Sequence, residues 1–132
     1  MTATPPTAQT VSYSVMLKHG NTLGSERIIC NNQISTTGNQ PLIINQDLAA
    51  GATNVAVNLA NFIDTANFIT LTDKGNQGFT VSTASGGASF QVAPGGSFSY
   101  QNGNATPPTL YLNNSSGTTK NYVEIGVVGS IA

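Results

Sequence analysis

The chain has 132 residues, of which 39% are hydrophobic and only 7% are charged, and its formal net charge at pH 7 is −1. A chain of this length predicts one domain with a single hydrophobic core. The sparse and balanced charge excludes a nucleic-acid binder that works through a basic surface, an acidic tail and a polybasic membrane-binding patch.

Neutral polar residues take the place of the missing charges: the sequence is rich in Ser, Thr, Asn and Gln, and it contains 14 Gly. Such a surface is unusual for a free cytosolic protein, because net charge helps to keep monomers apart. It suits a surface that is covered by copies of the chain or by partners, as in fibres, secreted β-domains and virion proteins. An ordinary soluble β-domain of unusual composition is the alternative interpretation.

The single cysteine, Cys30, excludes an intrachain disulfide, and its place at the end of the run 27–30 favours core packing over a reactive thiol. The first residues (MTATPP) contain neither a basic start nor an apolar stretch, so we expect no signal peptide. No window approaches the ~20 apolar residues of a membrane-spanning helix. We therefore expect a protein that is made and kept in a cytoplasm, without a membrane partner.

Residues 1–9 (MTATPPTAQ) are predicted to form an extended N-terminal arm, because Pro5 and Pro6 lack N–H groups and favour polyproline geometry. The remaining residues, 10–132, are predicted to form one β-domain, in which short alternating or apolar segments indicate strands. In chain order, these segments are Thr10–Lys18, Ser25–Cys30, Leu42–Asn45, Val55–Leu59, Phe68–Thr72, Phe79–Thr83, Ser89–Val92, Ser97–Tyr100, Leu110–Leu112 and Tyr122–Val128.

The connections between these strands are polar or contain glycine. The stretch Asn31–Gln40 is expected to be a loop, and residues 60–66 are expected to form a short helical turn with Phe62 and Ile63 directed inward. The turn Ala93–Gly96 (APGG) is predicted to close a tight hairpin. Because no segment shows a sustained helical period, we predict an all-β fold, a single-domain jelly-roll-like β-sandwich.

A catalytic or metal site is hard to assemble from this sequence. His19 is the only histidine, it stands beside Gly20 and Asn21 in what we interpret as a turn, and no nucleophile motif accompanies it. One His and one Cys cannot complete a tetrahedral metal site without carboxylates. We therefore predict no transition-metal site.

The carboxylates do not suggest a reaction either. No pair is indicated that could act as the two acids of a glycosidase, and no 12-residue calcium loop is present. Asp73, which precedes Lys74 and Gly75, is more simply a turn cap. We predict no catalytic residue, no cofactor and no metal among the five acidic residues, which are Glu26, Asp47, Asp64, Asp73 and Glu124.

Aromatic residues lie on the predicted strands, and the chain contains no Trp. The alternating positions of Phe68, Phe79, Phe90 and Phe98 favour core packing over the stacking of sugar rings. Tyrosine is favoured at protein interfaces. Half-exposed interface residues are therefore expected among the four tyrosines, Tyr13, Tyr100, Tyr111 and Tyr122.

Several stretches carry a resemblance to a known family: 68–82 (FITLTDKGNQGFTVS), 88–100 (ASFQVAPGGSFSY), 109–114 (TLYLNN) and 122–127 (YVEIGV). Over roughly residues 60–130, the rhythm of strands, Asn/Gly turns and a "v-x-P-G-G" corner resembles that of small bacteriophage virion proteins with a single jelly roll. The resemblance implies a vertex (penton), minor capsid or capsid decoration protein that binds by surface complementarity and carries no catalytic residues.

Composition and resemblance together predict a non-enzymatic virion structural protein, made in the host cytoplasm. We expect it to self-associate as a homo-oligomer, a trimer or a pentamer, and to cement neighbouring subunits and other capsid proteins. Contacts along the arm, at Thr4, Pro5, Pro6 and Thr7, are expected to bridge adjacent subunits.

A second function remains open, that of a glycan- or receptor-binding β-sandwich module of a phage fibre or spike. It predicts an exposed aromatic or Asp/Asn cluster on a loop such as Asn31–Gln40 or Gln101–Pro108. A third interpretation, an enzyme, requires a clustered His19 or a carboxylate pair.

Overall fold

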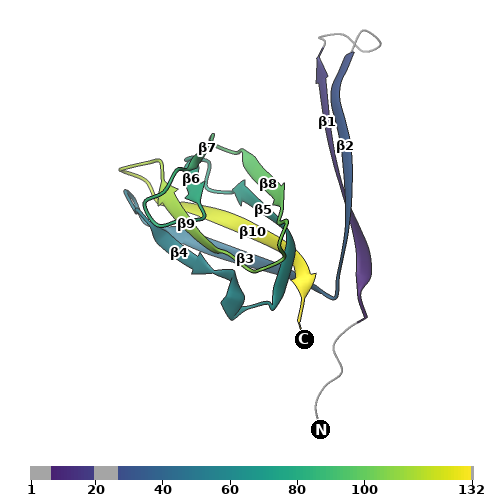
Figure 1. Ribbon diagram of the computed structural model, residues 1–132. Coiled ribbons are helices and arrows are strands. Elements are labelled where there is room, and N and C mark those ends of the chain that lie inside the picture. Colours follow the sequence, from purple (N-terminus) through teal and green to yellow (C-terminus); the bar gives the residue numbers. More distant parts are fainter. Residues whose placement is uncertain (1–6, 20–26, 132) are drawn as a thin grey trace.

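A two-stranded hairpin precedes an eight-stranded β-sandwich in this chain. The computed structural model describes residues 7–19 and 27–131, and it describes the backbone alone for residues 13, 15–19, 27–32 and 34. Strands β1 (Gln9–His19) and β2 (Arg27–Gly38) pair with each other and form a sheet of their own. The other eight strands form two four-stranded sheets (Figure 1).

The order of strands in these sheets is that of a jelly roll. The first sheet has the order β3-β10-β5-β8, the second has the order β4-β9-β6-β7, and all neighbouring strands are antiparallel. Among these eight strands, only β6 and β7 follow each other in one sheet, and every other connection between them crosses from one sheet to the other. The predicted all-β, jelly-roll-like sandwich is thereby confirmed. The bounds are β3 (Gln40–Leu48), β4 (Val55–Asn58), β5 (Thr65–Asp73), β6 (Phe79–Ser82), β7 (Phe90–Val92), β8 (Ser97–Gln101), β9 (Thr109–Asn114) and β10 (Asn121–Ser130).

Alternation of buried and more exposed residues along the strands places the core between the sheets. Every second residue of β10 from Asn121 to Gly129 is buried, and in β9 the buried positions are Leu110, Leu112 and Asn114. Burying each large aliphatic side chain stabilises the fold by about 1.5–3 kcal/mol. The largest fully buried apolar side chains are those of Leu48, Leu59, Ile69, Leu71, Phe79, Leu110, Leu112, Val123, Ile125 and Val127.

The short helical turn predicted at residues 60–66 appears as a 3₁₀ helix, η1 (Leu59–Asn61). Its N-cap is Asn58, whose side-chain oxygen accepts a hydrogen bond from the backbone N–H of Ala60 at 3.1 Å. Ile63 is buried as predicted, but Phe62, the C-cap residue of η1, is 50% exposed, because the inward-facing side is taken by its neighbours Leu59 and Ile63. In the described part of the chain, no helix is long and apolar enough to cross a membrane.

The predicted loop Asn31–Gln40 is wrong, because its residues belong to β2 up to Gly38 and to β3 from Gln40. Backbone pairing explains the difference: β1 supplies a partner for β2, from Gln9 opposite Gly38 to His19 opposite Arg27. A two-stranded ribbon encloses no core, so its strands do not require the apolar residues by which strands are recognised in a sequence. Residues 25 and 26 of the predicted strand Ser25–Cys30 lie outside the described residues.

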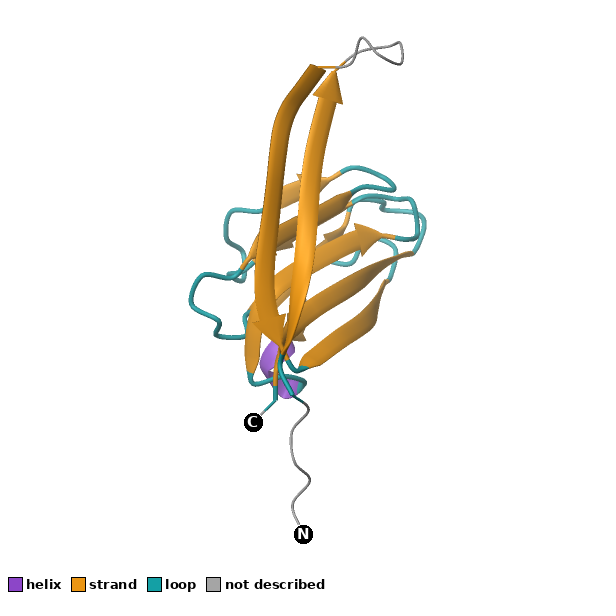
Figure 2. Cartoon of the chain, turned by 90° about the vertical axis from the view of Figure 1, so that its right-hand side faces the viewer, coloured by secondary structure: helices purple, strands orange, loops and turns teal. Residues whose placement is uncertain are grey.

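The base of the hairpin is fastened to the sandwich (Figure 2). The Asn67 side-chain amide donates to the carbonyl of Thr37 at 2.6 Å. The Asn39 side chain donates to the carbonyl of Ile131 at 3.1 Å and accepts from its N–H at 2.9 Å. Gly38 is buried against Gly129, where a Cβ atom would overlap the carbonyl oxygen of Gly129. The hairpin therefore starts from a fixed point on β5 and β10.

Candidate functional site

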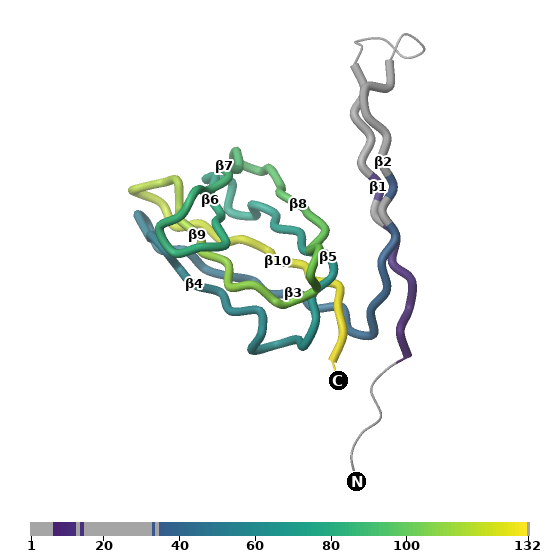
Figure 3. The backbone as a smooth tube through the Cα atoms, in the orientation of Figure 1, coloured from purple at the N-terminus to yellow at the C-terminus, as the bar shows by residue number. Residues whose placement is uncertain are grey.

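Strands β7 and β8 lie at the same edge of the sandwich, one in each sheet, and the turn 93–96 leads from one to the other (Figure 3). The tight hairpin predicted here is wrong, because β7 pairs with β6 and β8 pairs with β5. Turn chemistry is present, since Gly95 has φ +75° and the Gly96 N–H donates to the Ala93 carbonyl at 2.8 Å. Such a turn reverses the chain without deciding which strands pair beyond it.

Asp73 holds this corner in place. Its side chain is 4% exposed, and Oδ2 accepts hydrogen bonds from the backbone N–H groups of Gly78 at 2.7 Å and Gly95 at 3.0 Å. The Asp73 N–H in turn donates to the carbonyl of Gly96 at 2.9 Å. Two N–H donors on one carboxylate oxygen are charge-assisted bonds, which offset part of the cost of burying the charge. Asp73 caps the turn that follows it, as predicted, and also ties β5 to the turn before β8.

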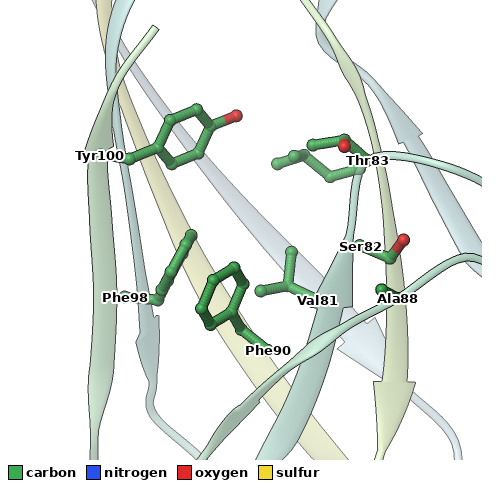
Figure 4. A pocket seen from close by; sticks show the side chains of 8 residues that line it. Val81, Ser82, Thr83, Ala88, Phe90, Phe98 and Tyr100 are labelled. Atoms are coloured by element: carbon green, nitrogen blue, oxygen red, sulfur yellow. The ribbon is translucent and has the colours of Figure 1, made fainter.

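Between the two sheets at this edge lies a pocket of about 350 Å³, called here the edge pocket. Its wall on β8 carries Phe98 and Tyr100, whose ring centroids are 5.6 Å apart. Phe90 on β7 stands beside Phe98, with ring centroids 4.8 Å apart. The edge pocket is lined by Val81, Ser82, Thr83, Ala88, Phe90, Phe98, Tyr100 and Leu110 (Figure 4).

Tyr100 supplies the unusual polar group of the edge pocket. It lies opposite Ile69 of β5 and extends from β8 toward the side of Thr83 (Figure 4). Its hydroxyl oxygen is buried and has no hydrogen-bond partner in the part of the chain that the structure describes. Desolvation by burial raises the pKa of the Tyr100 hydroxyl above its ordinary value of 10.0. The group is therefore a neutral donor that is covered by the lining of an apolar space.

The prediction that Phe90 packs in the core is wrong, because its side chain is 65% exposed. It lies opposite the buried Val81, on the side of β7 that faces the other sheet. Since β7 is a three-residue strand at the edge of its sheet, no further strand covers the outer side of its first residue. Of the other phenylalanines in this prediction, Phe68 and Phe79 are buried as expected and Phe98 is partly buried.

The lining of the edge pocket contains no charged side chain. The Ser82 hydroxyl already donates to the Ala84 carbonyl at 2.7 Å and accepts from its N–H at 3.1 Å. The arrangement thus offers apolar contact, aromatic faces and the hydroxyls of Thr83 and Tyr100, which is a setting for binding and not for acid–base chemistry. Sequence reasoning missed this site, although Phe90, Phe98 and Tyr100 flank the turn it identified.

The predicted arm falls mainly outside the described residues, which include none of Thr4, Pro5 and Pro6. Thr7 is exposed and borders a hollow of about 260 Å³ at the base of the hairpin. The wall of this hollow also includes Val11 of β1, Pro41 of β3 and Val128 of β10.

The four tyrosines proposed as interface residues lie on different surfaces. Tyr122 is 44% exposed on the outer side of β10, and Tyr111 is partly buried on the outer side of β9. Tyr100 faces the edge pocket, between the sheets. The backbone of Tyr13 lies opposite Ile34 in the hairpin, and its side chain is outside the described part. The described tyrosine side chains therefore form no single cluster.

Within the described ranges, no three His, Cys, Asp or Glu side chains lie close enough to hold a metal ion. His19 and Cys30 are placed by their backbones on β1 and β2, and their side chains are not among the described ones.

Comparison with known proteins adds no relative. The sequence matches no protein-family model, and neither the curated proteins nor the solved structures contain a significant match to the chain.

Proposed function

We propose that the chain is a non-enzymatic structural protein of a virion, a capsid decoration, minor capsid or vertex protein that self-associates and cements neighbouring subunits. It would be made in the host cytoplasm and assembled into the particle. The observation that carries the proposal is the hairpin β1–β2, which is fastened at its base to a jelly-roll sandwich and pairs with neither of its sheets.

The hairpin supports assembly because both of its outer edges are unpaired within the described residues. Each outer edge presents backbone N–H and C=O groups that another strand can pair with. The register pairs Val11 with Thr36 on one side and Ser12 with Ser35 on the other. A two-stranded ribbon is marginally stable alone in water, so a contact that covers its more apolar side stabilises it.

The sandwich supports the proposal in two ways. Jelly rolls of two sheets form capsid domains in viruses, an analogy of fold that is shared with lectins. The surface has few charges, with four Lys and Arg against five Asp and Glu, so closely packed copies repel each other little.

Native mass spectrometry of the full chain tests the self-association. We expect a closed oligomer, a trimer or a pentamer, and we expect a variant that lacks residues 1–9 to form it less readily. The variant should keep the urea unfolding midpoint of the full chain, which is the control for its fold. A full chain that stays monomeric at high concentration contradicts the self-association, and equal assembly of the shortened chain contradicts the role of the arm.

One observation favours a second candidate, a glycan- or receptor-binding module of a phage fibre or spike. Phe90 exposes an aromatic ring beside Phe98 at the mouth of the edge pocket, and exposed rings can stack against sugars. This ring lies on β7 and not on the loops from which the sequence predicted such contacts. Binding on a glycan array that Phe90→Ala abolishes would support this candidate, and an array without hits would contradict it.

A further inference from the structure

We propose that the edge pocket binds a small uncharged ligand of about two rings in size, largely apolar, with one hydrogen-bond acceptor that meets the Tyr100 hydroxyl. This inference is independent of the assembly role. It rests on the volume of the edge pocket, on the chemistry of its walls and on the unpartnered hydroxyl.

The volume indicates the size of the ligand. An apolar protein cavity of about 150 Å³ binds a single benzene molecule. The edge pocket, at about 350 Å³, is more than twice as large. One phenyl side chain inserted by a partner protein would therefore leave more than half of it empty, whereas a two-ring molecule would fill it.

The walls indicate its shape. Phe90, Phe98 and Tyr100 form a row of rings with successive centroid separations of 4.8 Å and 5.6 Å. Val81 and Leu110, which are 3% and 0% exposed, add aliphatic surface from the core. Flat rings gain from offset or edge-to-face contact with such aromatic side chains, beyond the area they bury.

The polar inventory indicates the charge and the acceptor. No lining residue is charged, so an ionic ligand would lose its hydration without gaining a partner. The Ser82 hydroxyl bonds to Ala84, and Thr83 is exposed, so water can bond to its hydroxyl. The Tyr100 hydroxyl, in contrast, is buried without a partner among the described residues. A carbonyl or ether oxygen of the ligand would satisfy this hydroxyl once the Tyr100 ring turns to uncover it, and a buried hydroxyl without a partner is costly.

Three naphthalenes that share one ring system test the proposal on the full chain. They are 2-acetylnaphthalene, which is neutral with an acceptor, 2-ethylnaphthalene, which is neutral without one, and 2-naphthoate, which is charged. We expect titration to shift the methyl resonances of Val81 and Leu110 in ¹H–¹³C spectra. The ketone should bind about fivefold more tightly than the hydrocarbon, the equivalent of one ordinary hydrogen bond. Naphthoate should bind at least tenfold more weakly than the ketone.

Variants locate the binding. Tyr100→Phe should remove the preference for the ketone over the hydrocarbon, whereas Tyr111→Phe, which removes a hydroxyl outside the edge pocket, should retain it. Ala88→Phe should fill the space and weaken both neutral probes at least tenfold, although Ala88 is exposed and its replacement should not disturb the core.

Three results would overturn the proposal. The first is a lack of methyl shifts at Val81 and Leu110 when the unmodified chain is saturated with the ketone. The second is binding that Ala88→Phe does not weaken in a chain with an unchanged unfolding midpoint. The third is a shift of the same methyls with protein concentration alone, which would assign the edge pocket to a second copy of the chain.

Discussion

Tyr100 and Asp73 are the two residues at this edge whose buried oxygens are not all paired within the described chain. The Asp73 carboxylate uses Oδ2 for two backbone donors while Oδ1 has no partner there, and the Tyr100 hydroxyl likewise has none. The two residues differ in what surrounds them. Asp73 lies among backbone groups that fix a turn, whereas Tyr100 faces apolar side chains that leave room for a ligand. The hydrogen bonds of Asp73 fix the turn before β8, and β8 is the strand that carries Tyr100.

The raised pKa of Tyr100 makes a prediction about alkaline stability. A tyrosine in the unfolded chain ionises near pH 10, and in the folded chain burial raises the pKa of Tyr100 above that value. Its contribution to the free energy of unfolding is therefore fully present below about pH 10 and is lost as the pH rises through the folded-state pKa. We expect urea midpoints to fall above pH 10 more steeply for the unmodified chain than for Tyr100→Phe. Parallel curves for the unmodified chain and for Tyr100→Phe would contradict the assignment.

At the scale of elements, the hairpin depends on one close approach. Gly38 ends β2 where its backbone lies against Gly129 of β10, so an alanine side chain there would collide with a backbone carbonyl, which cannot move aside as a flexible side chain can. The bonds from Asn39 to Ile131 and from Asn67 to Thr37 surround the same point. These contacts fix where the hairpin leaves the sandwich.

Gly38→Ala should therefore destabilise the attachment of the hairpin by about 1–3 kcal/mol, the usual cost of overpacking. We expect faster hydrogen exchange at the Ile131 N–H, because this group donates a hydrogen bond to Asn39 Oδ1 in the native contact. Gly117→Ala is the matched control, since a Cβ there meets nothing within 4 Å, and it should change stability by less than about 0.5 kcal/mol. The same exchange rate in both variants would show that the attachment of the hairpin does not require the close approach of Gly38 to Gly129.

The sequence predicted the elements of the second half of the chain better than their partners. Alternation identified the strands at Phe79 and Tyr122 because one face of each is buried, and burial leaves a period of two residues. Pairing across long sequence separations leaves no such local trace. The turn at residues 93–96 was therefore assigned to a hairpin, and the edge pocket, which exists only because β7 and β8 belong to different sheets, was not foreseen.

At the scale of the whole molecule, the sandwich and the hairpin make different demands. The sandwich buries its apolar residues between two sheets and is complete as a core. The hairpin is a sheet of two strands that pairs with neither sheet of the sandwich. On the sandwich itself, an apolar side chain, Ile43 on the outer face of β3, is 69% exposed. The sandwich has a packed core, whereas the hairpin has unpaired strand edges. A neighbour that covers the hairpin would therefore stabilise it, and this is the physical reason to expect assembly.

Such an assembly should be insensitive to salt. Nine charged residues and a net charge of −1 provide little long-range attraction or repulsion between copies, and backbone pairing and apolar contacts are not screened by ions. At an ionic strength of about 1 M, the Debye length falls to about 3 Å, which weakens interactions between exposed charges. We expect the oligomer distribution, measured by analytical ultracentrifugation, to change little between about 0.05 M and about 1 M sodium chloride. Dissociation as salt rises would mean that ion pairs hold the copies together, and the hairpin would then not be the main contact.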